Sequence, residues 1–217
     1  MEDDREKVFA SIRRALRGLD KFSANRSSKS PLIPEIATGF GSRFAQFKSE
    51  LSSLGGEAVA VDSEAAAAEY ISANMSQDAQ VFIYDDVRTR RAAFTSLITE
   101  SRQARFALEF GEGYDKREAA TFDCALTGCL ACVAETGTVV IETGMRLPAA
   151  LATQLFVIAG EDQLIPTLDE LFTDRFSKFE GSNLFLITGP SRTADIEKEL
   201  VTGVHGPKDV FVVFIQH

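Results

Sequence analysis

One carboxylate stands alone in an apolar stretch of the sequence, and it is the first candidate for chemistry. Glu135 is the only charged residue from Leu126 to Thr138, a run that reads L-T-G-C-L-A-C-V-A-E-T-G-T. A carboxylate buried away from other charges is protonated more easily than one in water, which suits it to acid/base or nucleophilic work. Gly137 permits a close approach of the backbone to a ligand or to a neighbouring element. The alternative is a turn glutamate satisfied by backbone amides.

A second run, Thr188–Glu197, brings a cation to the end of an apolar strand. It reads T-G-P-S-R-T-A-D-I-E, and the pattern predicts a helix that begins near Ser191. The free N–H groups at a helix N-terminus attract anions, and Arg192 adds a bidentate donor for a carboxylate or phosphate. Simple helix capping by Ser191 or Thr193 would also explain these residue types.

A third run, Gly203–Pro207, reads G-V-H-G-P and holds His205 between glycines. The chain has only one other histidine, His217. A histidine on a glycine-rich loop beside a strand can carry protons near neutral pH, although a lone histidine is also a common structural residue.

The three cysteines fall within nine residues of one another. Cys124, Cys129 and Cys132 have the spacing C-x4-C-x2-C, which matches the first three ligands of a plant-type ferredoxin. The chain has no fourth cysteine, and the surrounding segment is apolar. We therefore expect buried core residues and no metal ligands.

Apolar runs alternate with helical patterns from Gly41 onward, as in an α/β domain. Helices are expected at Ser42–Leu54, Ser63–Met75, Arg91–Glu100, Thr167–Phe176 and Thr193–Val201. The pair Gly55-Gly56 is expected to end the first of these helices, and Asp62 or Ser63 to cap the start of the second. Strands are expected at Glu57–Val61, Val81–Tyr84, Arg105–Phe110, Thr121–Leu126, Thr138–Ile141, Leu155–Ile158, Asn183–Thr188 and Val210–Ile215. Continuous apolar strands predict a largely parallel sheet with helices on both faces. Such sheets bind ligands outside the carboxyl ends of their strands, so we expect the three runs to converge at that edge.

The beginning of the chain has a different character. Residues 1–30 hold eight Lys and Arg against five Asp and Glu, whereas the whole chain of 217 residues has 23 against 32 and a net charge of −9. An apolar stripe at helical spacing predicts an amphipathic helix over residues 1–22, formed by Val8, Ile12, Ala15 and Leu19. This helix either packs on its own domain or docks on a partner subunit. Residues 23–40 are expected to be a linker, and residues 41–217 the α/β domain.

Composition excludes several classes of protein. The acidic balance argues against a nucleic-acid binder, which needs a basic footprint. The longest nearly uncharged stretches, such as Leu147–Gly160, are too short to span a bilayer, and no secretory signal pattern is expected at the acidic start. Three clustered cysteines do not make a disulfide framework. We therefore expect a cytoplasmic protein.

Together, the three runs resemble the LUD-domain family, and within it the LutC/YkgG type of lactate-utilisation proteins. The resemblance implies a Rossmann-like fold, similar to the superfamily of ribose-5-phosphate isomerase, glucosamine-phosphate deaminase and the CoA transferases. It also implies a role in the bacterial oxidation of L-lactate to pyruvate beside iron–sulfur partner subunits. In that family the clusters belong chiefly to the partners, so no cofactor is expected in this chain.

We expect Glu135 and His205 to be the catalytic residues at this edge. A small carboxylate or phosphate is expected to bind the remaining polar and glycine residues of the runs: Thr136, Gly137, Gly189, Ser191, Arg192, Thr193 and Asp195. Two alternatives remain open. One is a non-catalytic assembly or metabolite-sensing subunit, and the other is a transferase or isomerase that acts on a CoA ester or sugar phosphate with Glu135 as nucleophile.

Overall fold

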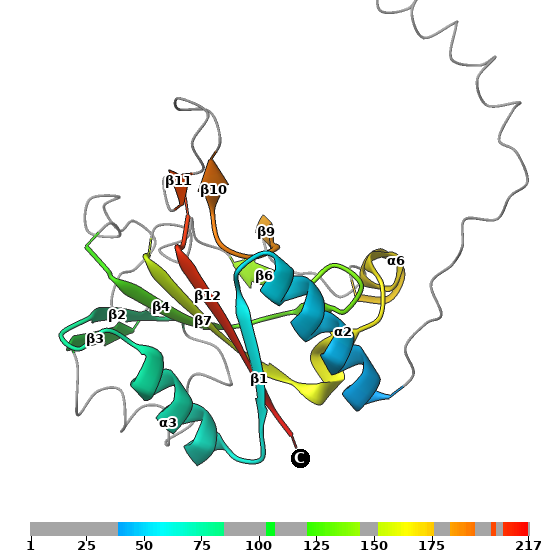
Figure 1. The fold of residues 1–217 in the computed structure, drawn as a ribbon, viewed down its shortest axis with the longest axis horizontal. Coiled ribbons are helices and arrows are strands. Elements are labelled where there is room, and N and C mark those ends of the chain that lie inside the picture. Colours follow the sequence, from blue (N-terminus) through cyan, green and yellow to red (C-terminus); the bar gives the residue numbers. More distant parts are fainter. Residues whose placement is uncertain are drawn as a thin grey trace, which may run out of the picture. The chain divides into compact units, whose positions relative to one another are not determined.

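The computed structural model describes residues 39–84, 103–106, 121–143, 152–175, 183–193, 201–202 and 206–216 (Figure 1). The amphipathic helix expected at residues 1–22, nearly all of the linker at 23–40, and the helix expected at Arg91–Glu100 lie outside these residues.

The described elements follow the alternation expected from the sequence. In chain order they are α2 (Phe40–Ser53), β1 (Glu57–Val61), α3 (Glu64–Asn74), β2 (Gln80–Ile83), β3 (Gln103–Phe106), β4 (Cys124–Gly128), β5 (Ala131–Val133), β6 (Thr138–Thr143), β7 (Gln154–Gly160), the 3-10 turn η5 (Glu161–Gln163), β8 (Leu164–Ile165), α6 (Leu168–Glu170), the π-helical turn η6 (Leu171–Arg175), β9 (Asn183–Ile187), β10 (Arg192–Thr193), β11 (Val201–Thr202) and β12 (Asp209–Ile215).

Six strands form the central sheet, in the order β1-β12-β7-β4-β2-β3, and every neighbouring pair is parallel. Strand β4 is buried along its whole length, and β7 is buried in all but its first residue. Strands covered on both faces have continuous apolar sequences, because neither face meets water. The expectation of a largely parallel α/β sheet is confirmed.

Helix α2 ends where the glycine pair of the sequence predicts. The N–H of Gly55 donates to the carbonyl of Ser52, and the N–H of Gly56 donates to the carbonyl of Leu51. Gly55 has φ +89°, the left-handed conformation that this type of helix end requires. Phe47 and Leu51, one helical turn apart, are fully buried, so α2 lays one face on the sheet.

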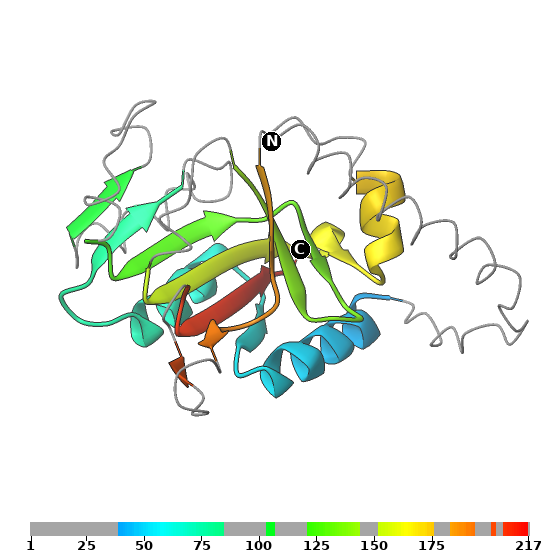
Figure 2. The ribbon, with the colours of Figure 1, turned by 90° about the horizontal axis from the view of Figure 1, so that it is seen from above.

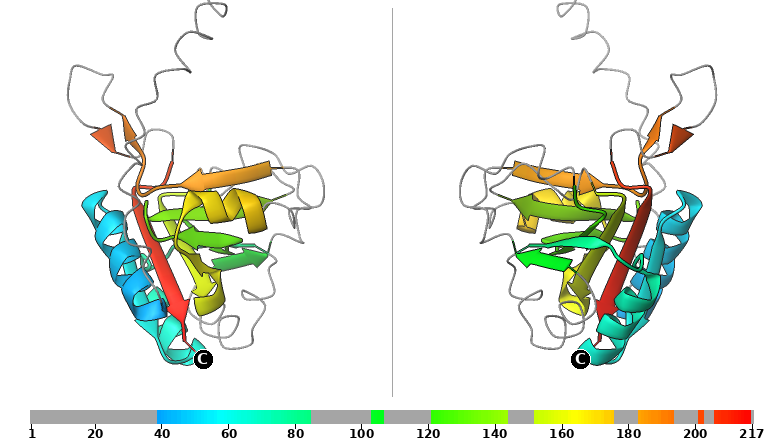
Figure 3. Two further views of the ribbon diagram at one scale, coloured as in Figure 1. Left: turned by 90° about the vertical axis from the view of Figure 1, so that its right-hand side faces the viewer. Right: turned by 90° about the vertical axis from the view of Figure 1, so that its left-hand side faces the viewer.

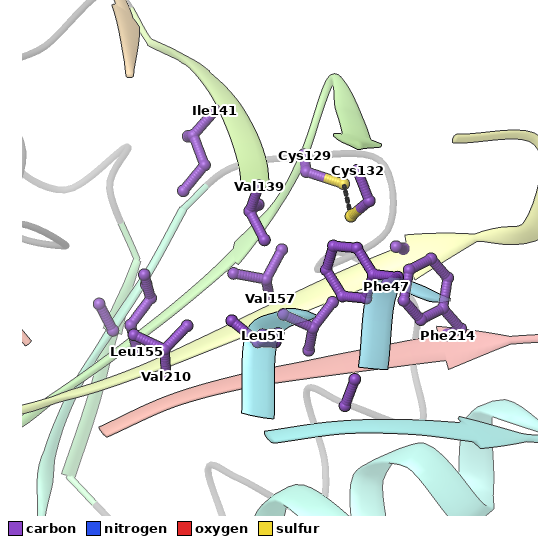
Figure 4. Close-up of a cluster of buried hydrophobic side chains, with 14 of the residues drawn as sticks. Phe47, Leu51, Cys129, Cys132, Val139, Ile141, Leu155, Val157, Val210 and Phe214 are labelled. Carbon is purple, nitrogen blue, oxygen red and sulfur yellow. Dashed lines mark hydrogen bonds between the residues drawn. The ribbon is translucent and has the colours of Figure 1, made fainter. Parts of the chain in front are cut away.

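The side chains of β7 divide the core into two layers. Leu155 and Val157 face a cluster with α2 (Figure 4), whereas Phe156 and Ile158 face a cluster with α3. Helix α3 begins at Ser63, whose hydroxyl oxygen accepts a hydrogen bond from the N–H of Ala66. Helices therefore cover both faces of the sheet, as expected.

A second sheet, which the sequence did not predict, has the order β8-β5-β6-β9. Strand β6 pairs antiparallel with both β5 and β9, and β8 pairs parallel with β5. Its strands run across the direction of the parallel strands (Figures 2 and 3). Val139 and Ile141 pack toward the α2 layer, while Val140 packs beneath α6 and η6. The runs at Thr138–Ile141 and Asn183–Thr188 are thus strands, but they do not belong to the parallel sheet.

Strands β10 and β11 form a separate antiparallel ribbon, with Arg192 opposite Thr202 and Thr193 opposite Val201. The expectation that a helix covers Thr193–Val201 is wrong at both of its ends, because the backbone there pairs as strands. In the part of the chain that the structure describes, no helix is both long and apolar enough to cross a membrane.

Candidate functional site

The run that holds Glu135 forms the tight turn between β5 and β6. Gly137 in this turn has φ +64°. A Cβ at this position would lie 2.5 Å from the backbone nitrogen of Leu51 in α2. No other residue type fits that approach without moving the helix, so this glycine sets the turn directly against the backbone of α2.

The second run lies beside this turn. The hydroxyl oxygens of Thr138 and Thr188 are 2.8 Å apart, and Thr136 donates a hydrogen bond to Thr138 over 2.7 Å. Gly189 has φ +96°, and a Cβ there would lie 2.9 Å from the Cβ of Leu54 at the end of α2. The first two runs therefore meet at the carboxyl-terminal end of α2.

The third run reaches the same place through the backbone. The N–H of Ser191 donates to the carbonyl of Pro207 over 2.8 Å, and the N–H of Lys208 donates to the carbonyl of Thr153 over 2.8 Å. The described parts of the three runs thus form one contiguous group, which we call the motif junction: Glu135–Thr138, Thr188–Ser191 and Gly206–Pro207.

The motif junction does not lie at the edge that the sequence predicted. Pro207 comes shortly before β12 and Thr153 directly before β7, so these contacts are at the amino ends of parallel strands. In Figure 1, β6, β9 and β10 lie near the start of β12, away from the end of the chain marked C. The carboxyl-edge rule failed because β6 and β9 belong to the second sheet, whose antiparallel pairing brings the start of β6 to the end of β9.

The anion site expected at a helix N-terminus near Ser191 is also different in form. Arg192 and Thr193 are strand residues, and the N–H of Ser191 is already bonded to Pro207. A ligand at this point would therefore depend on side chains rather than on free helix amides. The side chains of Arg192 and Thr193, and the whole of Asp195 and His205, lie outside the described residues.

Glu135 holds two elements of the chain together. It is half-buried, and its Oε1 accepts a hydrogen bond of 2.6 Å from the N–H of Leu168, the first residue of α6. Its own N–H donates to the carbonyl of Pro166, and the N–H of Ala134 donates to Ile165. An acidic group at a helix start is favourable because the first N–H groups have no partner within the helix. Glu135 is thus a turn glutamate whose carboxylate is bonded to a backbone amide, which is the alternative given in the sequence analysis.

The cysteines divide between the two faces of the parallel sheet. Cys124 packs in the α3 layer, and its sulfur lies 3.2 Å from Oε1 of Gln154. Cys129 and Cys132 pack in the α2 layer with their sulfurs 3.8 Å apart (Figure 4). A cluster that needs three or four thiolates around one centre does not fit this arrangement. Among the described residues, no three His, Cys, Asp or Glu side chains form a group that could hold a metal.

Two clefts involve residues that sequence reasoning did not single out. One, of about 360 Å³, lies at the amino ends of β2, β4 and β7, between Ser76–Ala79, Asp123 and Thr153–Gln154. The other, of about 530 Å³, is lined by Phe40, Arg43, Glu161 and Asp162.

The guanidinium of Arg43 donates to the carbonyls of Leu164 and Gly39, so it braces the second sheet against α2. A charged residue on an amphipathic helix gives no sequence signal that separates such a role from plain solvation. The side chain of Gln154 accepts hydrogen bonds from Ser76 and donates one to the carbonyl of Asn74. Its sequence context, one polar residue in an apolar stretch, gives no signal for this role either.

A model of the LUD domain matches residues 44–215 of this chain. The chain therefore belongs to the LUD-domain family, as the three runs indicated.

Within that family, the chain is similar to proteins named Lactate utilization protein C. It is 34% identical to the one from Deinococcus radiodurans over 98 residues, which is 43% of this chain and 46% of the relative. It is 31% identical to the one from Halalkalibacterium halodurans over 136 residues, 58% of each chain. The chain thus spans about half the length of the curated relatives it matches.

A solved structure has the same fold. The crystal structure of a DUF162 family protein from Deinococcus radiodurans superposes with a TM-score of 0.63, at 19% identity, over 82% of this chain and 99% of that one. At this level of identity the likeness concerns the fold alone.

Proposed function

We propose that this chain is a subunit of a bacterial lactate-utilisation system, which oxidises L-lactate to pyruvate in the cytoplasm together with iron–sulfur partner subunits. Membership of the LUD-domain family and the names of its relatives support the pathway. One observation carries a binding role for this chain: the run around Glu135 meets two runs that lie about 50 residues or more further along the sequence, in the motif junction.

The ligand we propose is a small carboxylate or phosphate. Arg192 begins β10, directly after Ser191 of the junction, and a guanidinium binds a carboxylate through two parallel hydrogen bonds. Thr136, Gly137, Gly189, Ser191, Thr193 and Asp195 are the further candidates for contact, all within or next to the junction in sequence. Direct hydrogen bonds join the three runs to one another, which supports this grouping.

The chemistry that we propose for Glu135 and His205 is proton transfer. Oxidation of a 2-hydroxy acid removes two electrons and two protons, and His205 and Glu135 are the groups proposed to take or hold protons. The electrons pass to the partner subunits, in which we place the iron–sulfur clusters.

One observation favours a second candidate, a non-catalytic assembly or metabolite-sensing subunit. The carboxylate of Glu135 is engaged with the N–H of Leu168 and is only half-buried. This structural engagement weighs against Glu135 as the nucleophile of a transferase.

Lactate-dependent dye reduction separates the two candidates. We expect no reduction by the purified full chain alone, and reduction when the iron–sulfur partner subunits are added. A Glu135→Gln chain that restores full reduction with the partners would support the non-catalytic candidate. Reduction by the partners without this chain would contradict both.

A further inference from the structure

Two of the three cysteines form a close pair in the core. Cys129 lies in the short connection between β4 and β5, and Cys132 lies in β5 itself. Their sulfurs are 3.8 Å apart, and the side chains point toward each other between α2 and the second sheet (Figure 4). Neither the parallel sheet nor the motif junction needs two thiols at this point, because any small apolar side chain would fill the space.

The separation of the two sulfurs is close to what a covalent bond requires. A disulfide joins its sulfurs at about 2.0 Å, so the pair must close by less than about 2 Å. Cys129 is outside the regular strands, whereas Cys132 is fixed by the pairing of β5 with β6 and β8. The movement must therefore come from the connection that carries Cys129, at the expense of its hydrogen bonds to Gln163 and Val140, while β5 stays in place.

The surroundings accommodate the closed form and limit access of a reagent to the pair. Cys132 is fully buried and Cys129 is 6% exposed, among apolar neighbours that include Phe47 and Val157 (Figure 4). A disulfide carries no charge, so an apolar site accepts it without a desolvation cost, while burial keeps a small disulfide away from both sulfurs. Reaction is therefore expected through brief local opening of the β4–β5 connection.

We propose that Cys129 and Cys132 are a redox pair that closes to a disulfide by exchange with a low-molecular-weight disulfide such as oxidised glutathione. The Cys129 sulfur attacks the small disulfide, forms a mixed disulfide and releases one small thiol. The Cys132 sulfur then attacks the sulfur of Cys129 and releases the second. Two protein thiols are oxidised, one small disulfide is reduced to two thiols, and the two protein protons end on those thiols.

Closure of the disulfide would act on the contact between the two sheets at the carboxyl end of β7, away from the motif junction. The carbonyl of Cys129 accepts a hydrogen bond from Nε2 of Gln163, whose Oε1 accepts one from the N–H of Gly160 at the end of β7. The connection that must move is thus tied to the end of a central strand. The pair links the redox state of small thiols to the geometry of this edge of the parallel sheet.

The test uses the full-length chain equilibrated in glutathione buffers of graded redox ratio. The samples are quenched in acid and alkylated under denaturing conditions. Intact-protein mass spectrometry counts the alkylated thiols, and peptide mapping locates the bridge. We expect two of the three thiols to become protected, the bridge to map to Cys129 and Cys132, and dithiothreitol to reverse it. The matched control is Cys124→Ala, which should behave as the parent because Cys124 lies on the other face of the sheet.

Cys129→Ala and Cys132→Ala should each abolish the internal bridge. The mapping in the unmutated chain stands even if either variant packs poorly. Three free thiols in the native chain at every ratio would overturn the proposal, as would a bridge that includes Cys124. A bridge that forms only in denaturant would overturn it as well.

Discussion

Replacing Gly137 with alanine should destabilise the fold, because this residue lies where the motif junction contacts α2. The new Cβ would lie 2.5 Å from the nitrogen of Leu51 and 2.9 Å from its Cα, and both are backbone atoms that no side-chain rotation can move. The turn also holds Gly137 at φ +64°. The substitution therefore combines backbone strain with a direct clash against the backbone of α2 at the fully buried Leu51.

These two contributions can be separated in magnitude. A left-handed conformation costs a non-glycine residue about 1–2 kcal/mol. Forcing extra atoms into a packed region costs about 1–3 kcal/mol more. Gly137→Ala should thus lower the free energy of unfolding by about 2–5 kcal/mol, a large part of the typical stability of a domain.

Gly39 provides the matched control. It also has a positive φ of +85°, with ψ 156°, a region that other residues adopt only under strain, but nothing lies within 4 Å of the position of its Cβ. Gly39→Ala should therefore show backbone strain without the clash, about 1–3 kcal/mol. Urea unfolding followed by circular dichroism measures both variants in the full-length chain. Equal destabilisation of the two variants would refute the argument that Gly137 is required by its contact with α2.

Further predictions concern single groups. Glu135→Ala should lower the free energy of unfolding by about 1–2 kcal/mol, because the N–H of Leu168 loses its acceptor, while Glu135→Gln keeps an acceptor oxygen and should unfold at nearly the parent urea concentration. Deleting residues 1–22 should leave the melting temperature nearly unchanged and weaken association with partner subunits or with itself; a large loss in a thermal scan would show that this segment belongs to the core. Partial burial, together with the hydrogen bond to Glu57 and its charge, raises the pKa of Tyr70 above its ordinary 10.0. The folded state then holds this proton more tightly than the unfolded state. The contribution of Tyr70 to the free energy of unfolding is therefore fully present below pH 10 and is lost as the pH rises further. Urea midpoints from neutral to strongly alkaline pH should fall less for Tyr70→Phe than for the parent, and equal slopes would count against this linkage.

The sequence was most informative where local chemistry decides the structure. The glycine pair after Leu54 predicted the end of α2, and Ser63 was one of two residues predicted to cap α3. The run Glu57–Val61 is a strand with the predicted bounds. Each of these features depends on a few adjacent residues, whose conformational preferences are strong.

The second sheet could not be predicted in the same way. Its two shortest strands, Ala131–Val133 and Leu164–Ile165, are too short to show a pattern. The apolar run of β6 reads like a buried parallel strand, because burial on both faces leaves no alternation to distinguish it. Whether two such strands pair in parallel or antiparallel depends on the path of the chain between them, not on their own residues.

The sequence predicted that the runs would come together, but not where in the fold they would meet. The runs around Gly137 and Gly189 do meet, but through the contacts of both glycines with α2 and the hydroxyl pair of Thr138 and Thr188. Gly137 was expected to allow a close backbone approach, and the neighbour is α2. The carboxyl-edge rule assumes that each run follows a strand of the parallel sheet. The first two runs instead border β6 and β9 of the second sheet, and Gly206–Pro207 precedes β12.

The central claim is that the motif junction binds a small anion through Arg192, and titration calorimetry tests it most directly. L-lactate and inorganic phosphate are titrated into the full-length chain and into Arg192→Ala, with circular dichroism to show that the variant is folded. We predict that the parent binds at least one of these anions and that the variant binds it more weakly by on the order of 1.5–3 kcal/mol. Equal binding by both chains, or no binding by the parent, would contradict the claim.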